Sequence, residues 1–376
     1  MQLKKRAANI ELIRILSMLM IVSLHFVRTG GMSASGVGLN LQFGRFVEAL
    51  CYSCVDLFVL ITGFFWQKSS HAISKSVKLV LQVLFFGVGT MLVGGLVFGW
   101  DTLSADIVLS SVFSLTTGRL WFIAVYIGLI FVAPYINTVI EKMTFAGHTT
   151  LCLVIVVLFS VSSTVINGGS VLIKDGGYDL IWFMSLYIIG AYLEKYNPFE
   201  KLGKSVCLLL AIGFPTLLYV WSYVAQKGHN AGLAFLHWNM SYKYASLPVV
   251  LAAVFTFEFF RKTEIKNELL SKIICRISSV CIGVYIVHMT RYAGEVLWTK
   301  IFHVDRYYSS PYMILYYIFF VASIFIVGCA VEYIRQLLFN KLNSKIGMWV
   351  EEKAIAIKDR IIDSCSKHIN LPDAAE

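Results

Sequence analysis

Long runs of apolar residues recur along this chain, and they restrict its fold more than any other feature. A helix needs roughly 20 mostly apolar residues to cross the hydrocarbon core of a bilayer, and about ten runs approach that length. They lie near residues 9–28, 46–66, 77–100, 119–137, 149–166, 178–194, 205–225, 244–260, 277–297 and 312–339. The sequence therefore predicts an all-α, polytopic bundle of transmembrane helices with about ten spans.

The composition agrees with a chain whose solvent is largely lipid. Of its 376 residues, 58% are hydrophobic and 14% are charged, whereas soluble domains have about 45–50% apolar and roughly 25% charged residues. No water-soluble fold of this length could bury so much apolar surface. We expect one membrane domain over residues 1–340 and a cytoplasmic tail over residues 341–376, with the lipid bilayer as the main partner.

The distribution of basic residues predicts the orientation. Lys4, Lys5 and Arg6 precede the first run, which is too long for a cleaved signal peptide and lacks a small-residue cleavage site. Cytoplasmic loops are enriched in Lys and Arg. If the N-terminus is inside, more than twice as many basic residues fall on the cytoplasmic side as outside, so both termini are predicted to be cytoplasmic. The net charge of +10 follows from this bias and does not indicate a nucleic-acid partner.

The tail combines apolar residues at helical spacing with interspersed basic residues. Its apolar positions are Ile346, Val350, Ala354, Ile357 and Ile361. This pattern predicts a short amphipathic helix on the inner leaflet.

Ionisable side chains inside the apolar runs are the strongest indication of a functional site, because they are costly in hydrocarbon and normally face an interior cavity. Arg14 and His25 share one face of the first helix and lie ~16 Å apart along its axis. Asp56 is predicted near mid-membrane in the second run. In the ninth run, His288 belongs to a predicted outer stripe that also holds Tyr285, Arg291, Tyr292 and Glu295.

Each of these residues also has a purely structural interpretation. Arg14 and Glu11 are three residues apart and can form an ion pair, His25 can be an interhelical hydrogen-bonding residue, and Asp56 can cap a helix. Two histidines and an aspartate at similar depth above an arginine nevertheless favour a chemical path. Cys51 and Cys54 form a CxxC without a second pair or a histidine cluster, so no metal site is expected.

Several motifs together resemble the acyltransferase family 3 integral membrane proteins. The spacing from Arg14 to His25 resembles the family's R-x10-H signature. Residues 55–65 (VDLFVLITGFF) are similar to its VDLFFxxSGF pattern, and residues 120–134 to its LWFL…P segment, with Arg119 in place of a more usual His. Residues 187–193 (YIIGAYL) match YxxGxYL, and residues 278–288 resemble S-x-Y-x-x-H. These motifs occur in family order over most of the chain.

The resemblance implies transfer of an acyl group, usually acetyl, from cytoplasmic acyl-CoA to a hydroxyl of an extracytoplasmic glycan. Acyl-CoA is then a donor substrate, no permanently bound cofactor is expected, and the location is the cytoplasmic membrane of a bacterium. A basic inner mouth of Arg14, Lys75 and Lys78 would hold the CoA phosphates. His25 would act as general base or transient acyl carrier, with His288 and Asp56 orienting it or relaying protons.

The chain departs from the family pattern at three points. Lys75 and Lys78 replace the arginines of the family's RxxR, which removes bidentate phosphate contacts. The late E-x-P is reduced to Glu332. The extracytoplasmic hydrolase-like domain of some members is missing, so we expect direct transfer to a lipid-linked or polymer acceptor, or completion by a separate protein.

Two other classes of protein compete with this interpretation. A carrier for a small polar metabolite would use the same buried charges as a substrate path, and a membrane scaffold would use them as structural ion pairs. Consumption of acyl-CoA separates the enzyme from both. Oligomeric state and acceptor identity do not follow from the sequence.

Overall fold

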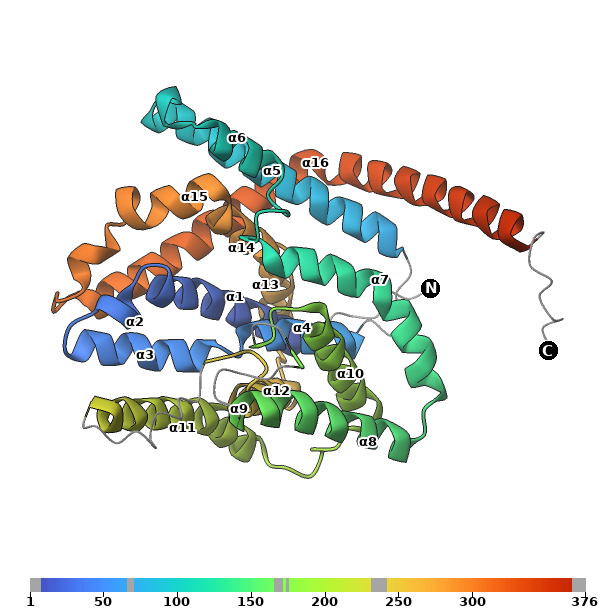
Figure 1. Cartoon of the computed structure of the whole chain (residues 1–376), viewed down its shortest axis with the longest axis horizontal. Coiled ribbons are helices and arrows are strands. Elements are labelled where there is room, and N and C mark those ends of the chain that lie inside the picture. Colours follow the sequence, from blue (N-terminus) through green and yellow to red (C-terminus); the bar gives the residue numbers. More distant parts are fainter. Residues whose placement is uncertain (1–7, 66–70, 166–171, 174–175, 231–241, 367–376) are drawn as a thin grey trace.

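The computed structural model describes residues 8–65, 71–165, 172–173, 176–230 and 242–366 (Figure 1). All regular secondary structure in these residues is helical, which confirms the predicted fold class.

The helices follow one another with short connections. In the first half they are α1 (Ala8–Arg28), α2 (Met32–Ser35), α3 (Leu39–Cys51), α4 (Cys54–Phe65), α5 (Ala72–Phe98), α6 (Ala105–Val112), α7 (Trp121–Lys142), α8 (Phe145–Ile155) and α9 (Ser162–Val165). In the second half they are α10 (Leu180–Tyr196), α11 (Lys204–Asn230), α12 (Leu247–Arg261), α13 (Glu268–Ser278), α14 (Cys281–Met289), α15 (Arg291–Val296) and α16 (Met313–Ser366). Shorter π-helical and 3-10 segments cover Trp100–Thr102, Val156–Val161, Leu297–Ile301 and Val304–Tyr307.

Among the described residues, 8 helical stretches are long and apolar enough to cross a membrane. They are Ala8–Arg28, Leu39–Phe65, Ala72–Phe98, Trp121–Lys142, Phe145–Val165, Lys204–Gly228, Glu268–Met289 and Met313–Ser366. The other two predicted runs, 178–194 and 244–260, correspond to α10 (17 residues) and α12 (15 residues). Both are shorter than the roughly 20 residues of a typical span, and both pack against α4 inside the bundle. The chain is thus a multi-pass membrane protein, and the count of ten stays a prediction.

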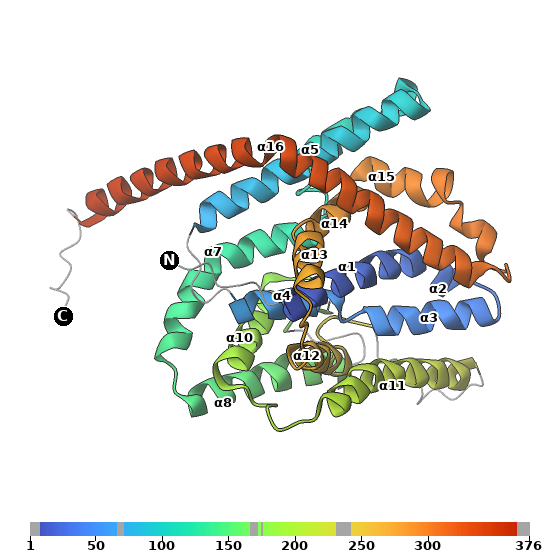
Figure 2. The ribbon, with the colours of Figure 1, turned by 180° about the vertical axis from the view of Figure 1, so that it is seen from behind.

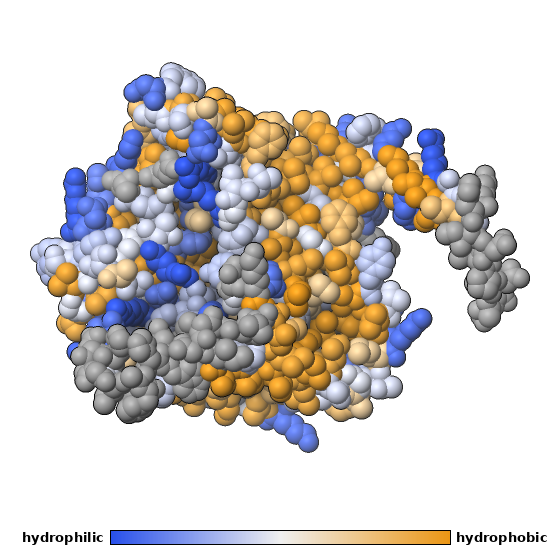
Figure 3. Space-filling view, in the orientation of Figure 1, coloured by the Kyte–Doolittle hydropathy of each residue, from blue (hydrophilic) through white to orange (hydrophobic). Residues whose placement is uncertain are grey.

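The surface has the polarity expected of a protein in a bilayer. Hydrophobic side chains cover the middle of the face in Figure 3, and hydrophilic ones gather at its left end. Large apolar side chains such as Leu96 and Leu209 are 73% and 71% exposed. A soluble monomer rarely exposes such a continuous apolar surface, so lipid is the medium that covers it.

The start of α1 and the end of α16 lie at the same end of the bundle, on the right in Figure 1 and on the left in the reverse view of Figure 2. The opposite end holds the C-terminus of α1 and helix α2. This arrangement agrees with an even number of crossings, and the sequence assigns the shared end to the cytoplasm.

We therefore expect a cysteine introduced at Lys227 to react with a membrane-impermeant maleimide in intact cells. Cysteines at Lys266, whose side chain is 88% exposed, and at the exposed native Cys365 should react only after the membrane is permeabilised. Labelling of position 266 from outside would reverse the orientation and the mechanism that depends on it.

The crossing of α4 and α10 fixes the centre of the bundle. A Cβ atom on Gly63 would lie 2.2 Å from the carbonyl oxygen of Tyr187, and one on Gly190 would lie 2.4 Å from that of Leu60. Small residues of this kind let two membrane helices approach backbone to backbone. The close approach brings Asp56 of α4 to Trp182 of α10.

Replacing Gly190 with leucine should therefore destabilise the fold by about 1–3 kcal/mol, because the added side chain forces the two backbones apart. Thermal unfolding in detergent, followed by size-exclusion chromatography, measures the loss. Gly213→Leu on α11 is the matched control, since a Cβ there meets nothing within 4 Å. Equal effects of the two substitutions would contradict the packing argument.

The predicted ninth run is not one helix. It is divided into α13, α14 and α15, with breaks after Ser278 and at Thr290, whose ψ angle is 156°. Irregular backbone at membrane depth needs partners within the protein. Gln336 of α16 supplies one by donating a hydrogen bond of 3.0 Å to the carbonyl of Ser279.

Helix α16 is longer than the sequence predicted. It runs without a break for 54 residues, so the expected boundary between residues 340 and 341 falls inside it, and the tail continues the last span instead of forming a separate helix. The tail packs on the start of α5, where a Cβ on Gly347 would lie 2.7 Å from Ser74 Oγ. His71 Nδ1 and Glu351 Oε2 are 2.8 Å apart at the same place.

Candidate active site

The side chains of His25 and His288 meet between α1 and α14. His25 Nδ1 lies 2.8 Å from His288 Nε2, although the residues are 263 positions apart in the sequence. His288 is 1% exposed, whereas His25 is only partly buried. The structure thus brings together the two histidines that the sequence singled out.

Hydrogen bonding determines which nitrogen of each neutral ring carries the proton. Nδ1 of His288 contacts the carbonyl oxygen of Val284, and a carbonyl can only accept, so this nitrogen is protonated. Nε2 of His288 is then the acceptor, and Nδ1 of His25 donates to it. Nε2 of His25 is left with a lone pair, as a general base or nucleophile requires.

The ring of Tyr285 holds the other side of the histidine pair. It stacks on His25 with ring centroids 6.3 Å apart and an interplanar angle of 29°. The predicted outer stripe is divided by the break at Thr290, because Tyr285 and His288 lie on α14 whereas Arg291 of α15 binds Asp106 at 3.0 Å. The side chain of Glu295 lies outside the described residues.

Asp56 does not join the histidines. Its Oδ1 accepts a hydrogen bond of 3.1 Å from Trp182 Nε1, and in the described part of the chain it makes no hydrogen bond to His25 or His288. It is fully buried, and its Oδ2 has no hydrogen-bond partner among the described residues. The predicted role of Asp56 in orienting the histidines or relaying protons to them therefore has no direct contact to support it.

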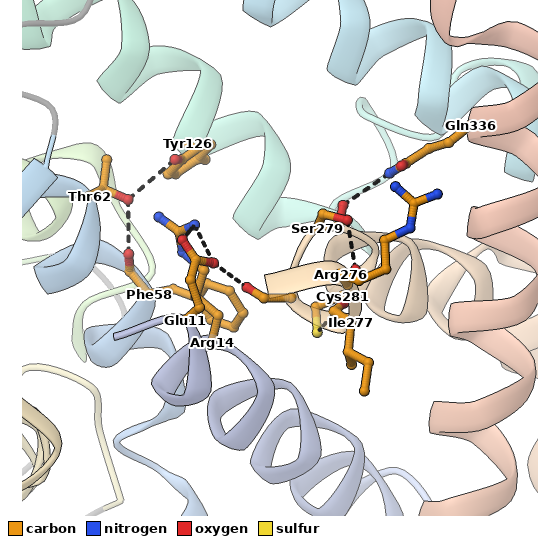
Figure 4. A network of polar contacts seen from close by, with 11 residues as sticks. Glu11, Arg14, Phe58, Thr62, Tyr126, Arg276, Ile277, Ser279, Cys281 and Gln336 are labelled. Carbon is orange, nitrogen blue, oxygen red and sulfur yellow. Dashed lines mark hydrogen bonds and ion pairs between the residues drawn. The ribbon is translucent and has the colours of Figure 1, made fainter. Parts of the chain in front are cut away.

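Arg14 lies nearer the predicted cytoplasmic end of α1. Its Nη1 donates to both carboxylate oxygens of Glu11 at 3.0 Å, and Ser278 also donates to Glu11. The simple ion pair is thus present, yet the Arg14 side chain keeps 28% of its surface exposed against 4% for Glu11. Figure 4 shows its guanidinium turned to the side on which the hydrogen-bonded pair Thr62 and Tyr126 lies.

The two lysines predicted to bind CoA begin α5, at the same end of the bundle as the start of α1 (Figure 1). Glu351 of α16 and Lys78 are within electrostatic range of Lys75. The described contacts do not join either lysine to Arg14, so the predicted inner mouth consists of two groups of cations rather than one cluster.

A buried ion pair on α16 was missed by the sequence interpretation. Arg335 forms two hydrogen bonds with Glu332, of 2.6 and 2.8 Å, and is 6% exposed. The sequence analysis counted Arg335 with the cytoplasmic residues, which is wrong. A Glu and an Arg at i and i+3 within an apolar run were the available signal, since charges at membrane depth are normally paired. Gly283 packs on Glu332, so this pair supports the start of α14.

An apolar cavity of about 380 Å³ lies on the far side of His288. Its lining comes mainly from α5, α15 and α16 and includes Phe86, Tyr292 and Ile324. Small-molecule sites combine such apolar walls with a few polar groups. Room for a small apolar group is therefore available next to the histidine pair.

The fold and the site define a multi-pass α-helical membrane protein with a buried histidine pair. A family model described as an acyltransferase domain, that of acyltransferase family 3, matches residues 7–333. Because the match covers most of the chain, the protein belongs to this family of membrane acyltransferases, as the sequence motifs predicted. No curated protein and no solved structure matches it.

Proposed function

We propose that this protein transfers an acyl group, most simply acetyl, from cytoplasmic acyl-CoA to a hydroxyl of an extracytoplasmic or lipid-linked glycan in a bacterial cytoplasmic membrane. The observation that carries the proposal is the hydrogen bond between His25 and His288, which leaves the lone pair of His25 Nε2 available. The family supplies the reaction class.

In direct transfer, His25 Nε2 takes the proton of the acceptor hydroxyl while that oxygen attacks the thioester carbonyl. The tetrahedral intermediate then breaks its C–S bond, and protonated His25 returns the proton to the CoA sulfur. In the alternative route, the same nitrogen attacks the thioester first and carries the acyl group to the hydroxyl. Both routes need the tautomer that the contact between His288 and Val284 favours.

The positions of the cations suit a donor that stays on one side of the membrane. An acyl-CoA carries several charges, and moving unpaired ions into hydrocarbon is prohibitive. Arg14 lies ~16 Å below His25 along α1. In this proposal Arg14, Lys75 and Lys78 bind the CoA head group from the cytoplasm while only the acyl end approaches His25.

Purified protein in liposomes tests the function with acetyl-CoA labelled in the acetyl group. We expect free CoA and an ester-labelled product when glycolipids extracted from the source membrane are present. Transport of a small solute without release of CoA would instead establish the carrier interpretation.

The role of Arg14 can be separated from that of its ion pair. Arg14→Gln alone leaves the carboxylate of Glu11 buried without its charge partner, which is itself strongly destabilising. The double variant Glu11→Gln/Arg14→Gln removes both charges. We expect this variant to remain folded and to raise the half-saturating acetyl-CoA concentration about tenfold, the effect of losing a charged hydrogen bond of ~1.4 kcal/mol. Normal half-saturation in the double variant would reduce Arg14 to a structural role.

A further inference from the structure

Four aromatic rings converge at the end of the bundle predicted to be outside. We call Tyr52, Trp121, Tyr178 and Tyr244 the aromatic cluster. Ring centroids are 4.5 Å apart for Trp121 and Tyr178, 4.8 Å for Tyr178 and Tyr244, and 5.0 Å for Tyr52 and Tyr244. The rings come from the start of α7, the hinge between α3 and α4, and the residues preceding α10 and α12. Segments far apart in the sequence thus build one surface.

A charged pair borders the aromatic cluster. Arg28 Nε lies 3.5 Å from Glu48 Oε1, and Arg28 also donates to the hydroxyl of Tyr52. Its guanidinium carbon is 5.5 Å from the centre of the Tyr52 ring. The Arg28 side chain is 45% exposed, so part of it can contact a ligand.

Aromatic contacts connect this border to the histidine pair. Trp121 contacts Phe122, and Phe122 contacts Tyr285, with ring centroids 6.1 and 5.9 Å apart. Tyr285 stacks on His25. Arg28 follows His25 by three residues, which places it about one helical turn, or ~4.5 Å, nearer the outer end of α1. A small ring on the cluster is therefore within one turn of the proposed base.

The cluster differs from the aromatic belt of membrane proteins. In that belt, Tyr and Trp side chains lie among lipid head groups. Here Tyr52 and Tyr244 are only 2% and 4% exposed, and the hydroxyls of Tyr52 and Tyr178 are 3.5 Å apart. The rings therefore face the interior of the bundle, and only Trp121 and Tyr178 keep partial exposure.

We propose that the aromatic cluster and the pair Arg28–Glu48 form the acceptor subsite, which binds one uncharged pyranose unit of the glycan; this rests on the proposed function. The ring faces of Trp121 and Tyr178 are apolar and suit the C–H face of a sugar. Arg28 donates to sugar hydroxyls and Glu48 accepts from them. Because Glu48 already balances the charge of Arg28, the subsite favours a neutral sugar over an anionic one.

Steady-state transfer from labelled acetyl-CoA tests this subsite in liposomes, with glycolipids extracted from the source membrane as the acceptor. Tyr178→Ala should raise the half-saturating glycolipid concentration about tenfold, in the range of aromatic hot spots. The half-saturating acetyl-CoA concentration should stay unchanged. Tyr312→Ala is the matched control, because that tyrosine is 68% exposed and lies outside the cluster. Glu48→Gln is a second variant that keeps the side-chain volume and decides the question if Tyr178→Ala does not fold.

Competition tests the charge of the sugar. Glycans released from the same extract and separated into neutral and acidic pools should differ, with the neutral pool inhibiting transfer. Stronger inhibition by the acidic pool would overturn the assignment of an uncharged unit. If the wild type transfers acetyl but Tyr178→Ala or Glu48→Gln matches Tyr312→Ala in glycolipid half-saturation, the subsite is wrong while the function stands. If the wild type never releases CoA, the proposed function fails first.

Discussion

Replacing His25 with alanine is expected to lower the turnover number by at least ~10²-fold, the typical contribution of a general base. The half-saturating acetyl-CoA concentration should change little, because the proposed contacts to CoA lie about three helical turns away at Arg14. Release of CoA and formation of labelled ester, both expressed per folded molecule in liposomes, measure the effect.

His148→Ala is the matched control for this substitution. His148 is also a buried interhelical histidine, with Nε2 3.2 Å from the carbonyl oxygen of Ile188. Its loss reports the cost of removing such a contact without touching the proposed chemistry. Normal turnover by a well-folded His25→Ala protein would remove His25 from the mechanism. An acetyl adduct on His25, trapped in the wild type without acceptor, would favour the acyl-carrier route over direct transfer.

Loss of His288 should have the second largest effect, although His288 need not touch the substrate. In His288→Phe the ring volume is retained, but Nδ1–H of His25 loses its acceptor and the tautomer is no longer fixed. Turnover should fall ~10²-fold or more, approaching the ~10⁴-fold typical when a catalytic histidine loses its orienting partner. The same liposome assay measures this fall.

The conservative variant His288→Gln distinguishes positioning from packing. Its amide oxygen can accept from His25 Nδ1–H, so turnover should recover at least partly relative to His288→Phe, with acetyl-CoA half-saturation unchanged in both variants. Equal activity of the two variants would show that the hydrogen bond does not orient His25.

The interior contacts around the site explain why some interpretations of charged residues failed. The sequence placed Asp56 at the right kind of position, buried inside the bundle, but its partner is Trp182, 126 residues away. The basic residues Lys75 and Lys78 lie beside the tail of α16, because α16 continues as one helix past residue 340. Arg335 was counted as cytoplasmic because it lies near the end of an apolar run, and only its two hydrogen bonds to Glu332 show that it is buried.

The sequence by itself determined the properties that depend on local periodicity and on transfer between water and lipid. Apolar runs determined the helical membrane fold, and the regular rise of a helix determined the relative depth of Arg14 and His25. Only the tertiary structure decided which side chains meet. The contact of His25 with His288 requires the break between α13 and α14, which Gln336 and the pair Glu332–Arg335 stabilise from α16. A backbone break at membrane depth is satisfied by partners distant in the chain, and apolar periodicity carries no information about them.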